Sequence, residues 1–242
     1  ELYLGWDAKY FYYIKSLYFF EGKTIYDLNQ FSQNIWHPYF GSYIWGFFWS
    51  LSSLEIEYFG RLFYLFLFCF SFFYISRISV NEKVNNLIYL ILVVIFYEYE
   101  FFSGLQEILI FSILVLISKY FFEITKKKNL IYLILLYSNL FIWIKSEGIF
   151  YFFTSLFLIS LVKQITVLNK IYTLLIFTAF YILKIYIYDI SELTINSQQA
   201  FYNFDYFLSL NFEIIINKIF NISIWLIYYL SINIFSMLLI LI

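Results

Sequence analysis

The sequence predicts an all-α protein, a polytopic bundle of transmembrane helices preceded by an outward-facing segment with interfacial helices. Of its 242 residues, 63% are hydrophobic and only 13% are charged. An average soluble domain is about half apolar and about one quarter charged, so 15 basic and 16 acidic side chains are too few to cover a soluble core of this size. The charges also lie in clusters between long apolar runs, which is typical of helices that cross about 30 Å of hydrocarbon.

Seven apolar stretches are predicted as spans. They are helices, because the strands of a membrane barrel would alternate polar and apolar residues over about ten positions, and the sequence has no such alternation. Residues 1–57 form the outward-facing segment with its interfacial helices, and residues 58–242 form the bundle. The chain begins with Glu1 and ends in an apolar run, so we expect a fragment truncated at both termini. The spans cover residues 58–76, 85–100, 105–122, 129–145, 148–162, 171–188 and 221–242.

The distribution of basic residues predicts the orientation of the bundle, because Lys and Arg are enriched in cytoplasmic loops. Three connections fall on one side and together hold eight of the 15 basic residues and only two of the 16 acids: residues 76–84, 119–128 and 163–170. We therefore place these connections in the cytoplasm. Four segments then face outward: residues 1–57, 98–107, 145–148 and 189–218.

Residues 37–53 have the composition of a short span, but counting them as one would reverse the side of every later loop. We predict instead an aromatic-rich helix that lies in the outer interface. Tryptophan is favoured at that depth, and this region carries Trp36, Trp45 and Trp49.

Two residues of the outward segment are candidates for chemistry. Asp7, in the sequence GWDA, can act as a general base if a substrate hydroxyl comes within hydrogen-bonding distance, or it can cap a helix over residues 8–20. His37 is the single histidine and precedes Pro38, which suits the first turn of a helix. His37 can bind a phosphate or an acceptor group, or it can be structural.

An acidic turn between two predicted spans carries Glu98, Glu100 and Glu107. Glu107 falls in the first turn of the next helix, where the helix dipole favours a negative charge. That explanation does not extend to the other two acids. A bound cation or a hydroxyl-bearing ligand would account for all three.

A polar break between two later spans, IKSEG at residues 144–148, carries Lys145 and Glu147. Lys145 either extends its ammonium to the interface or neutralises a lipid phosphate at the outer headgroups. Arg61, at the outer end of the first span, can do the same. Ionisable residues this close to the hydrocarbon are functional candidates, although Glu147 alone is also explained as a solvent-facing side chain.

Taken in order, these segments resemble the membrane glycosyltransferases of the GT-C superfamily, above all its protein mannosyltransferases and the aminoarabinose transferases of lipid A. The resemblance covers about residues 5–165. GWDAKYFYYIKSLYFFEGKTIYD is similar to the first outward loop of that family, with the acidic residue at Asp7. WHPYFGSYIWGFFWSLSSLEIEYFGRLFYLF is similar to the surface helix and the span that follows it, with Arg61 in the expected place.

Two further segments extend the resemblance. SGLQE at residues 103–107 is similar to the second acidic turn, with Glu107 where the family often has Asp, and IKSEG is similar to the Lys-containing break. The span that the family has ahead of its acidic loop is absent from this chain, so we expect the fragment itself to be inactive.

The resemblance implies an inverting transfer of a sugar from a polyprenyl-phosphate donor to an acceptor hydroxyl at the outer, extracytoplasmic face of a membrane. Asp7 would be the base. The phosphate of the donor would be bound by Lys145 with its neighbour Glu147, by Arg61 and by His37.

Glu107 is the second catalytic candidate of this resemblance. Together with Glu98 or Glu100 it would position the acceptor or a divalent metal. Membrane lipid and the lipid-linked donor would be the partners, and the bacterial inner membrane the location, with the active face outward.

Other functions fit parts of the same pattern. A transporter or flippase places paired charges near the middle of the bilayer, whereas Lys184 is the one charge well inside a predicted span. A polymerase or ligase of surface polysaccharides uses similar lipid-linked donors. A non-catalytic membrane protein would have no reason to concentrate acids, His37 and Lys145 on one face, although the sorting of basic residues to the cytoplasmic side produces part of that asymmetry. The net charge of −1 offers no basic stripe for nucleic acid, and the single Cys69 excludes an intramolecular disulfide.

Overall fold

The first of two compact units contains nearly all of the chain that can be described. The computed structural model describes residues 3–30, 38–52, 56–97, 102–145, 147–163 and 165–190, with residues 216, 220, 221, 223 and 224. The first unit comprises residues 1–93 and 97–194, and the second comprises residues 94–96 and 195–242. Most of the predicted span 221–242 lies outside the described residues.

Every regular element in the described part of the chain is a helix, which confirms the all-α fold class. The six helices from α3 onward coincide with the first six predicted spans. In chain order the elements are η1 (Ala8–Tyr12), α1 (Tyr13–Phe20), η2 (Asp27–Gln30), α2 (Phe40–Ser50), α3 (Tyr58–Ile75), α4 (Glu82–Phe96), α5 (Glu107–Glu123), α6 (Leu130–Ile144), α7 (Gly148–Leu161) and α8 (Val167–Ile190).

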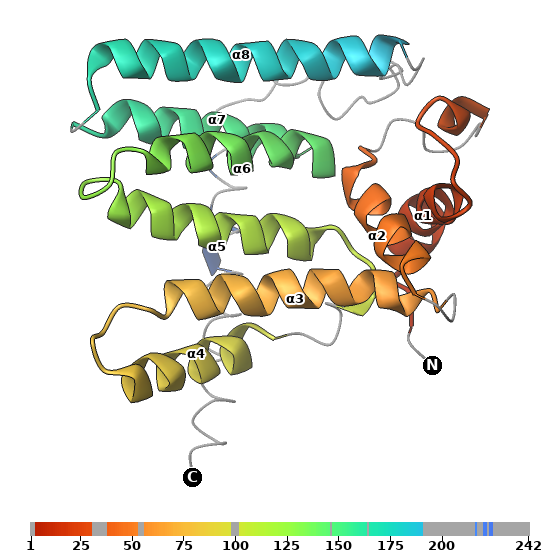
Figure 1. Cartoon of the computed structure of the whole chain (residues 1–242), viewed down its shortest axis with the longest axis horizontal. Helices are drawn as coiled ribbons and strands as arrows, with labels where there is room; N and C mark the ends of the chain where they lie inside the picture. Colours follow the sequence, from red (N-terminus) through yellow and green to blue (C-terminus); the bar gives the residue numbers. More distant parts are fainter. Residues whose placement is uncertain are drawn as a thin grey trace. The chain divides into compact units, whose positions relative to one another are not determined.

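Within the first unit, α3, α5, α6, α7 and α8 lie side by side, and α1 and α2 pack across one end of this row (Figure 1). The helices α5 to α8 alternate in direction because short turns connect them. The core between α3, α5 and α6 is apolar, with Phe68, Leu116 and Ile134 fully buried. Within the predicted outward segment, residues 1–57, the described helix α2 packs against α3 and α6 at this end of the row and carries α1 on it.

The α1–α2 pair depends on one close approach of the two backbones. A Cβ atom added to Gly46 in α2 would lie 2.5 Å from the backbone oxygen of Ser16 in α1. Only glycine allows the two helices to pack at this separation. The aromatic rings of Phe20 and Trp49 stack beside the contact, with ring centroids 4.3 Å apart.

Two described helices are long and apolar enough to cross a membrane: Tyr58–Ile75 and the Val167–Lys184 part of α8. The helices α6 and α7 are apolar but shorter, with 15 and 14 residues. Only 11% of the α8 window is buried within the protein. Large apolar side chains such as Leu175 and Ile182 are therefore more than half exposed.

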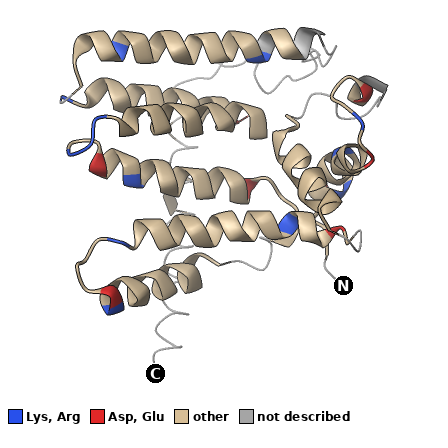
Figure 2. Cartoon of the chain, in the orientation of Figure 1, with Lys and Arg blue, Asp and Glu red and all other residues tan. Residues whose placement is uncertain are grey.

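Basic residues outnumber acidic ones at one end of the helices of the first unit, whereas both kinds occur at the other end (Figure 2). Lys and Arg gather in the α3–α4, α5–α6 and α7–α8 connections, at the ends of the helices that lie away from α1 and α2. Glu107 begins α5 at the opposite end. The three connections that we predict to share one side do lie at one end of the unit.

Helix boundaries differ from the predicted ones where local hydrogen bonds intervene. The helix α4 begins at Glu82 rather than residue 85, because the Asn81 side chain accepts a hydrogen bond of 3.0 Å from the backbone N–H of Lys83. The predicted helix over residues 8–20 begins with a π-helical turn, η1, and continues as α1. The helix that we predict over residues 37–53 corresponds to α2, which covers Phe40–Ser50.

Candidate functional site

Three segments that are far apart in the sequence meet at the α1–α2 end of the first unit. They are the N-terminal segment around Asp7, the turn that precedes α5, and the break between α6 and α7. The backbone N–H of Gly5 donates to the backbone oxygen of Ser103 at 3.0 Å, and Lys145 forms an ion pair with Glu107. These contacts bring three of the four sequence motifs together.

The turn before α5 has its shape because of Gly104. This residue has φ +84°, and a Cβ atom there would lie 2.6 Å from the Trp45 ring and 3.2 Å from the Ala8 side chain. A side chain at this position would be both strained and obstructed. The glycine of the SGLQE motif therefore lets the acidic turn lie directly against α2 and the N-terminal segment.

Lys145 and Glu107 form the ion pair at the centre of the site. Lys145 follows the last residue of α6, and Glu107 is the first residue of α5. Each charge suits the helix dipole at its position, so helix termini account for part of this arrangement. The Lys145 side chain is 17% exposed and that of Glu107 is 53% exposed, so a ligand can still reach the carboxylate.

The charges of two more acids also act on Lys145. Burial by itself lowers the pKa of Lys145, but the hydrogen bond that Lys145 donates to Glu107 and the charges of Glu107, Glu147 and Asp7 outweigh it and raise that pKa above its ordinary value. Lys145 is therefore a permanent cation at neutral pH. Three carboxylates from three segments lie within electrostatic reach of it.

Tyr12 lies among the same carboxylates, and the sequence reasoning missed it. Its side chain is 2% exposed, and its pKa is raised by burial and then by the charges of Glu107, Glu147 and Asp7. The phenol therefore keeps its proton and remains a hydrogen-bond donor. The residue ends the π-helical turn η1, and such turns are frequent at functional sites. The only feature of the sequence that could have indicated a role for Tyr12 was its short distance along the chain from Asp7.

The structure contradicts the interpretation of Asp7 as a helix cap. Asp7 has helical backbone angles, φ −61° and ψ −39°, and its side chain makes no capping hydrogen bond. A cap needs an extended backbone so that its oxygen can turn back to the free N–H groups. Asp7 is half-buried, and its carboxylate forms no hydrogen bond or ion pair with any residue that the structure describes.

Arg61 lies behind the site rather than at its surface. The guanidinium is 1% exposed, pairs with Glu57 at 2.7 Å and donates to the backbone oxygen of Phe102 at 2.5 Å. It also lies over the ring of Trp45. The expectation that Arg61 contacts a lipid phosphate needs correction, because the guanidinium is buried in the protein beside these partners. As placed, it fixes the acidic turn to α3.

A buried hydrogen-bond chain supports the same turn from α2 and α3. The Gln106 amide donates to the Tyr64 hydroxyl at 2.9 Å, and that hydroxyl donates to the backbone oxygen of Gly41 at 2.8 Å. Gln106 and Tyr64 are fully buried. A Cβ atom at Gly41 would lie 1.3 Å from the Gln106 side-chain oxygen. The position of Glu107, the next residue, is therefore set by three helices.

Of the remaining predicted site residues, the structure describes only Glu147. Glu147 is exposed and precedes the first residue of α7. His37, Glu98 and Glu100 lie outside the described residues. Among the residues that are described, no three His, Cys, Asp or Glu side chains gather to hold a metal ion.

Known proteins offer no guide to this arrangement. No protein-family model, no curated protein and no solved structure matches the chain. The chemistry must therefore be argued from the site itself, which places an unpaired carboxylate, a permanent cation and a protonated phenol close together. Such groups can accept a proton, offset a negative charge and orient a hydroxyl.

Proposed function

We propose that this chain carries the active site of a polytopic membrane glycosyltransferase that uses a sugar donor linked to polyprenyl phosphate. The observation that carries the proposal is the convergence of Asp7, Glu107 and Lys145 at one end of the helical unit. These are the residues to which the resemblance to GT-C enzymes assigns roles, and about a hundred residues or more separate Asp7 from the other two.

The exposed surface supports placing the protein in a lipid bilayer. The helix α8 exposes most of its apolar side chains, and α3 is only one-third buried. Contact with lipid removes this apolar surface from water without a further protein layer. The basic connections then face the cytoplasm, as Lys-rich and Arg-rich loops do, and the site faces outward at the opposite end.

The proposed reaction assigns a step to each group. The acceptor hydroxyl gives its proton to the Asp7 carboxylate while its oxygen forms a bond to the anomeric carbon. The bond between that carbon and the phosphate oxygen breaks, and its electron pair leaves with the phosphate. Lys145 offsets the charge that develops on the phosphate, and attack opposite the leaving group inverts the anomeric carbon.

The two other carboxylates and the phenol position the reactants. Glu107 holds the ammonium of Lys145 at the site and remains open enough to accept a hydrogen bond from a sugar hydroxyl. The Tyr12 hydroxyl, which keeps its proton, orients a carboxylate or the acceptor oxygen. A site rich in carboxylates suits a ligand with many hydroxyl groups, which are hydrogen-bond donors.

Replacing Asp7 with Asn in the full-length protein tests the proposal. The change keeps the size of the side chain and removes the proton acceptor, so transfer from a lipid-linked donor should fall by 100-fold or more, since general base catalysis contributes about 10²–10⁴. Asp27→Asn is the matched control, because Asp27 lies in the same outward segment but bonds only to Thr24. Normal turnover in Asp7→Asn would remove Asp7 from the mechanism.

The membrane placement has an independent test. Single cysteines at Lys23 and Lys127, in a protein whose Cys69 is replaced by Ser, should react with an impermeant reagent from opposite sides of sealed vesicles. Reaction of both from the same side would contradict the proposed topology.

A further inference from the structure

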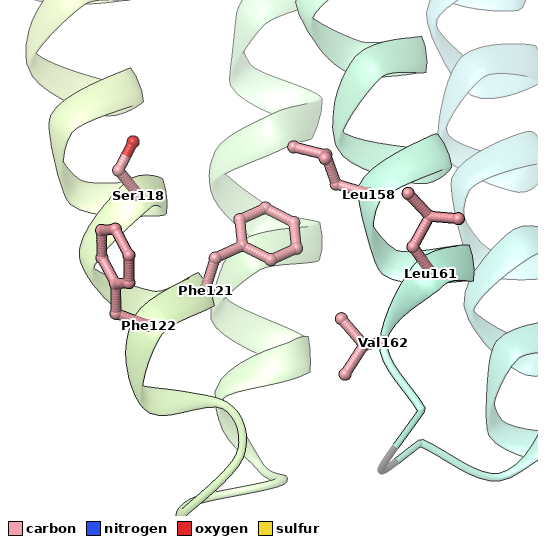
Figure 3. Close-up of a pocket in the computed structure, with 6 residues that line it drawn as sticks. All are labelled: Ser118, Phe121, Phe122, Leu158, Leu161 and Val162. Atoms are coloured by element: carbon pink, nitrogen blue, oxygen red, sulfur yellow. The ribbon is translucent and has the colours of Figure 1, made fainter.

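An apolar groove lies between the C-terminal ends of α5 and α7 (Figure 3). Its volume is about 360 Å³, and it is open to the surface rather than enclosed. The groove lies at the basic end of the unit, away from the site that contains Asp7. Its lining consists of Ser118, Phe121, Phe122, Leu158, Leu161 and Val162.

The lining offers very little hydrogen bonding to a polar ligand. Ser118 is its one polar residue, and the Ser118 hydroxyl donates to the backbone oxygen of Leu114 at 2.8 Å within the same helix. The other lining side chains are aliphatic or aromatic. A polar ligand would lose its water here with little compensation, so the lining suits a hydrocarbon segment.

Four lysines lie next in the chain to the two helix ends that form the groove. The helix α5 ends at Glu123 and is followed closely by Lys126, Lys127 and Lys128, and Lys163 directly follows Val162 of the lining. All four side chains are exposed. None forms an ion pair or a side-chain hydrogen bond with a residue that the structure describes.

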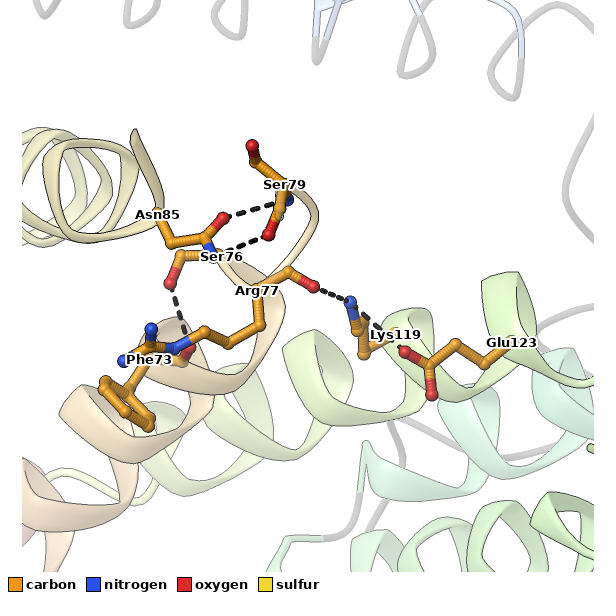
Figure 4. Close-up of polar contacts among 7 residues, drawn as sticks. All are labelled: Phe73, Ser76, Arg77, Ser79, Asn85, Lys119 and Glu123. Atoms are coloured by element: carbon orange, nitrogen blue, oxygen red, sulfur yellow. Dashed lines mark hydrogen bonds and ion pairs between the residues drawn. The ribbon is translucent and has the colours of Figure 1, made fainter. Parts of the chain in front are cut away.

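Other basic residues at this end do have partners, as Figure 4 shows for two of them. Lys119 donates to the backbone oxygen of Arg77 at 2.9 Å and pairs with Glu123 at 3.3 Å, and the Arg77 guanidinium lies 4.1 Å from the centre of the Phe73 ring. The acid nearest in sequence to the free lysines is therefore already paired. Among the described basic side chains at this end, only Lys83, Lys126, Lys127, Lys128 and Lys163 have no partner, and the last four lie next to the groove.

We propose that the groove binds an acyl chain of an anionic phospholipid whose phosphate contacts Lys126–Lys128 and Lys163. A phospholipid joins the two required chemistries in one molecule, because its tail matches the apolar lining and its headgroup supplies the negative charge that the lysines lack. Anionic headgroups attract clustered lysines at the cytoplasmic face in this way. The inference rests on the membrane placement in the proposed function but not on the transfer reaction.

Native mass spectrometry of the purified protein in detergent tests the inference with two probes, phosphatidylglycerol and phosphatidylcholine with identical acyl chains. Phosphatidylglycerol should remain bound to a single site and phosphatidylcholine should not. The double variant Lys127→Gln/Lys128→Gln should weaken that binding by about 25-fold, because each lysine at an anionic surface contributes a factor of about five. The control Lys9→Gln/Lys23→Gln removes two charges from the other end and should change nothing.

The groove is tested separately from the charges. Leu158→Trp fills the groove and should weaken phosphatidylglycerol binding by about fivefold through lost packing against the tail. Phe157→Trp, on the exposed side of the same helix, is the matched control and should bind like the unmodified protein. Thermal unfolding of each variant checks that the fold is kept.

Equal binding of the two lipids, equal loss in the two lysine variants, or full binding by Leu158→Trp would each overturn the inference. Binding of glycerol phosphate as tightly as the whole lipid would also overturn it, because the groove would then contribute nothing. The measurement uses no sugar donor or acceptor. A failed transfer reaction with intact lipid binding would therefore refute the proposed function alone.

Discussion

Replacing Lys145 with Met distinguishes a cation that acts on the substrate from one that only joins two helix ends. Lys145 is 17% exposed and its partner Glu107 is 53% exposed, so solvent screens the ion pair strongly. A pair of this kind contributes on the order of 1 kcal/mol or less to stability. Met fills the volume of the Lys stem, so the free energy of unfolding should change by no more than that amount.

The expected effect on catalysis is much larger. A group that offsets charge developing in the transition state contributes about 3 kcal/mol, which corresponds to a loss of 10²–10³ in kcat. Initial rates of transfer from a lipid-linked sugar donor, measured at saturating donor, give this quantity. Thermal unfolding of the same preparation gives the change in stability.

Lys23→Met is the matched control for this experiment. Lys23 pairs with Glu21 at 2.9 Å, and both side chains are more than 40% exposed, so the control breaks an ion pair of the same type at a distance from the site. Its transfer rate should be unchanged. Loss of activity in Lys145→Met that is matched by an equal loss of stability, or no loss of activity at all, would refute the reasoning.

Two further predictions concern the support of the site and the residue that the sequence reasoning missed. Gly41→Ala should lower the free energy of unfolding by about 2 kcal/mol, because its Cβ would displace the buried Gln106 amide and this overpacking outweighs the gain in helix propensity. Chemical denaturation measures the change, and an unchanged denaturation midpoint would contradict the prediction. Tyr12→Phe should reduce transfer at least tenfold with little change in stability, since it removes the hydroxyl that we propose to orient a carboxylate or the acceptor oxygen. Tyr10→Phe, an exposed neighbour in the same turn, should transfer at the normal rate, and equal rates in the two variants would exclude a role for the Tyr12 hydroxyl.

Helix positions were predictable because each depends on a local property of the chain. Runs of apolar residues form helices wherever no polar side chain interrupts them, and the interruptions at Asn81 and Lys145 coincide with observed helix ends. The nature of the helix start near Asp7 was not predictable. A carboxylate before an apolar run satisfies the pattern of a cap, but the π-helical turn places the Asp7 side chain elsewhere.

The role of Arg61 shows a second limit of sequence reasoning. An arginine at the end of an apolar helix has the same local pattern whether it faces lipid headgroups or the protein interior. Here Glu57 lies one turn before Arg61 and the carbonyl of Phe102 comes from 41 residues away. The first contact could be expected from i, i+4 spacing, but the second depends on how α3 packs against the turn before α5.

The sequence by itself determined the helical class, the boundaries of most helices and the separation of basic from acidic connections, because composition and periodicity act within a few turns of one helix. The sequence placed Asp7, Glu107 and Lys145 in segments on one side of the bundle, but only the tertiary structure decided that they and Tyr12 come together. Their meeting depends on close approaches at Gly41, Gly46 and Gly104 and on the buried Gln106–Tyr64 hydrogen bond. Such contacts join residues that are distant in the sequence, and no local pattern encodes the distance between them.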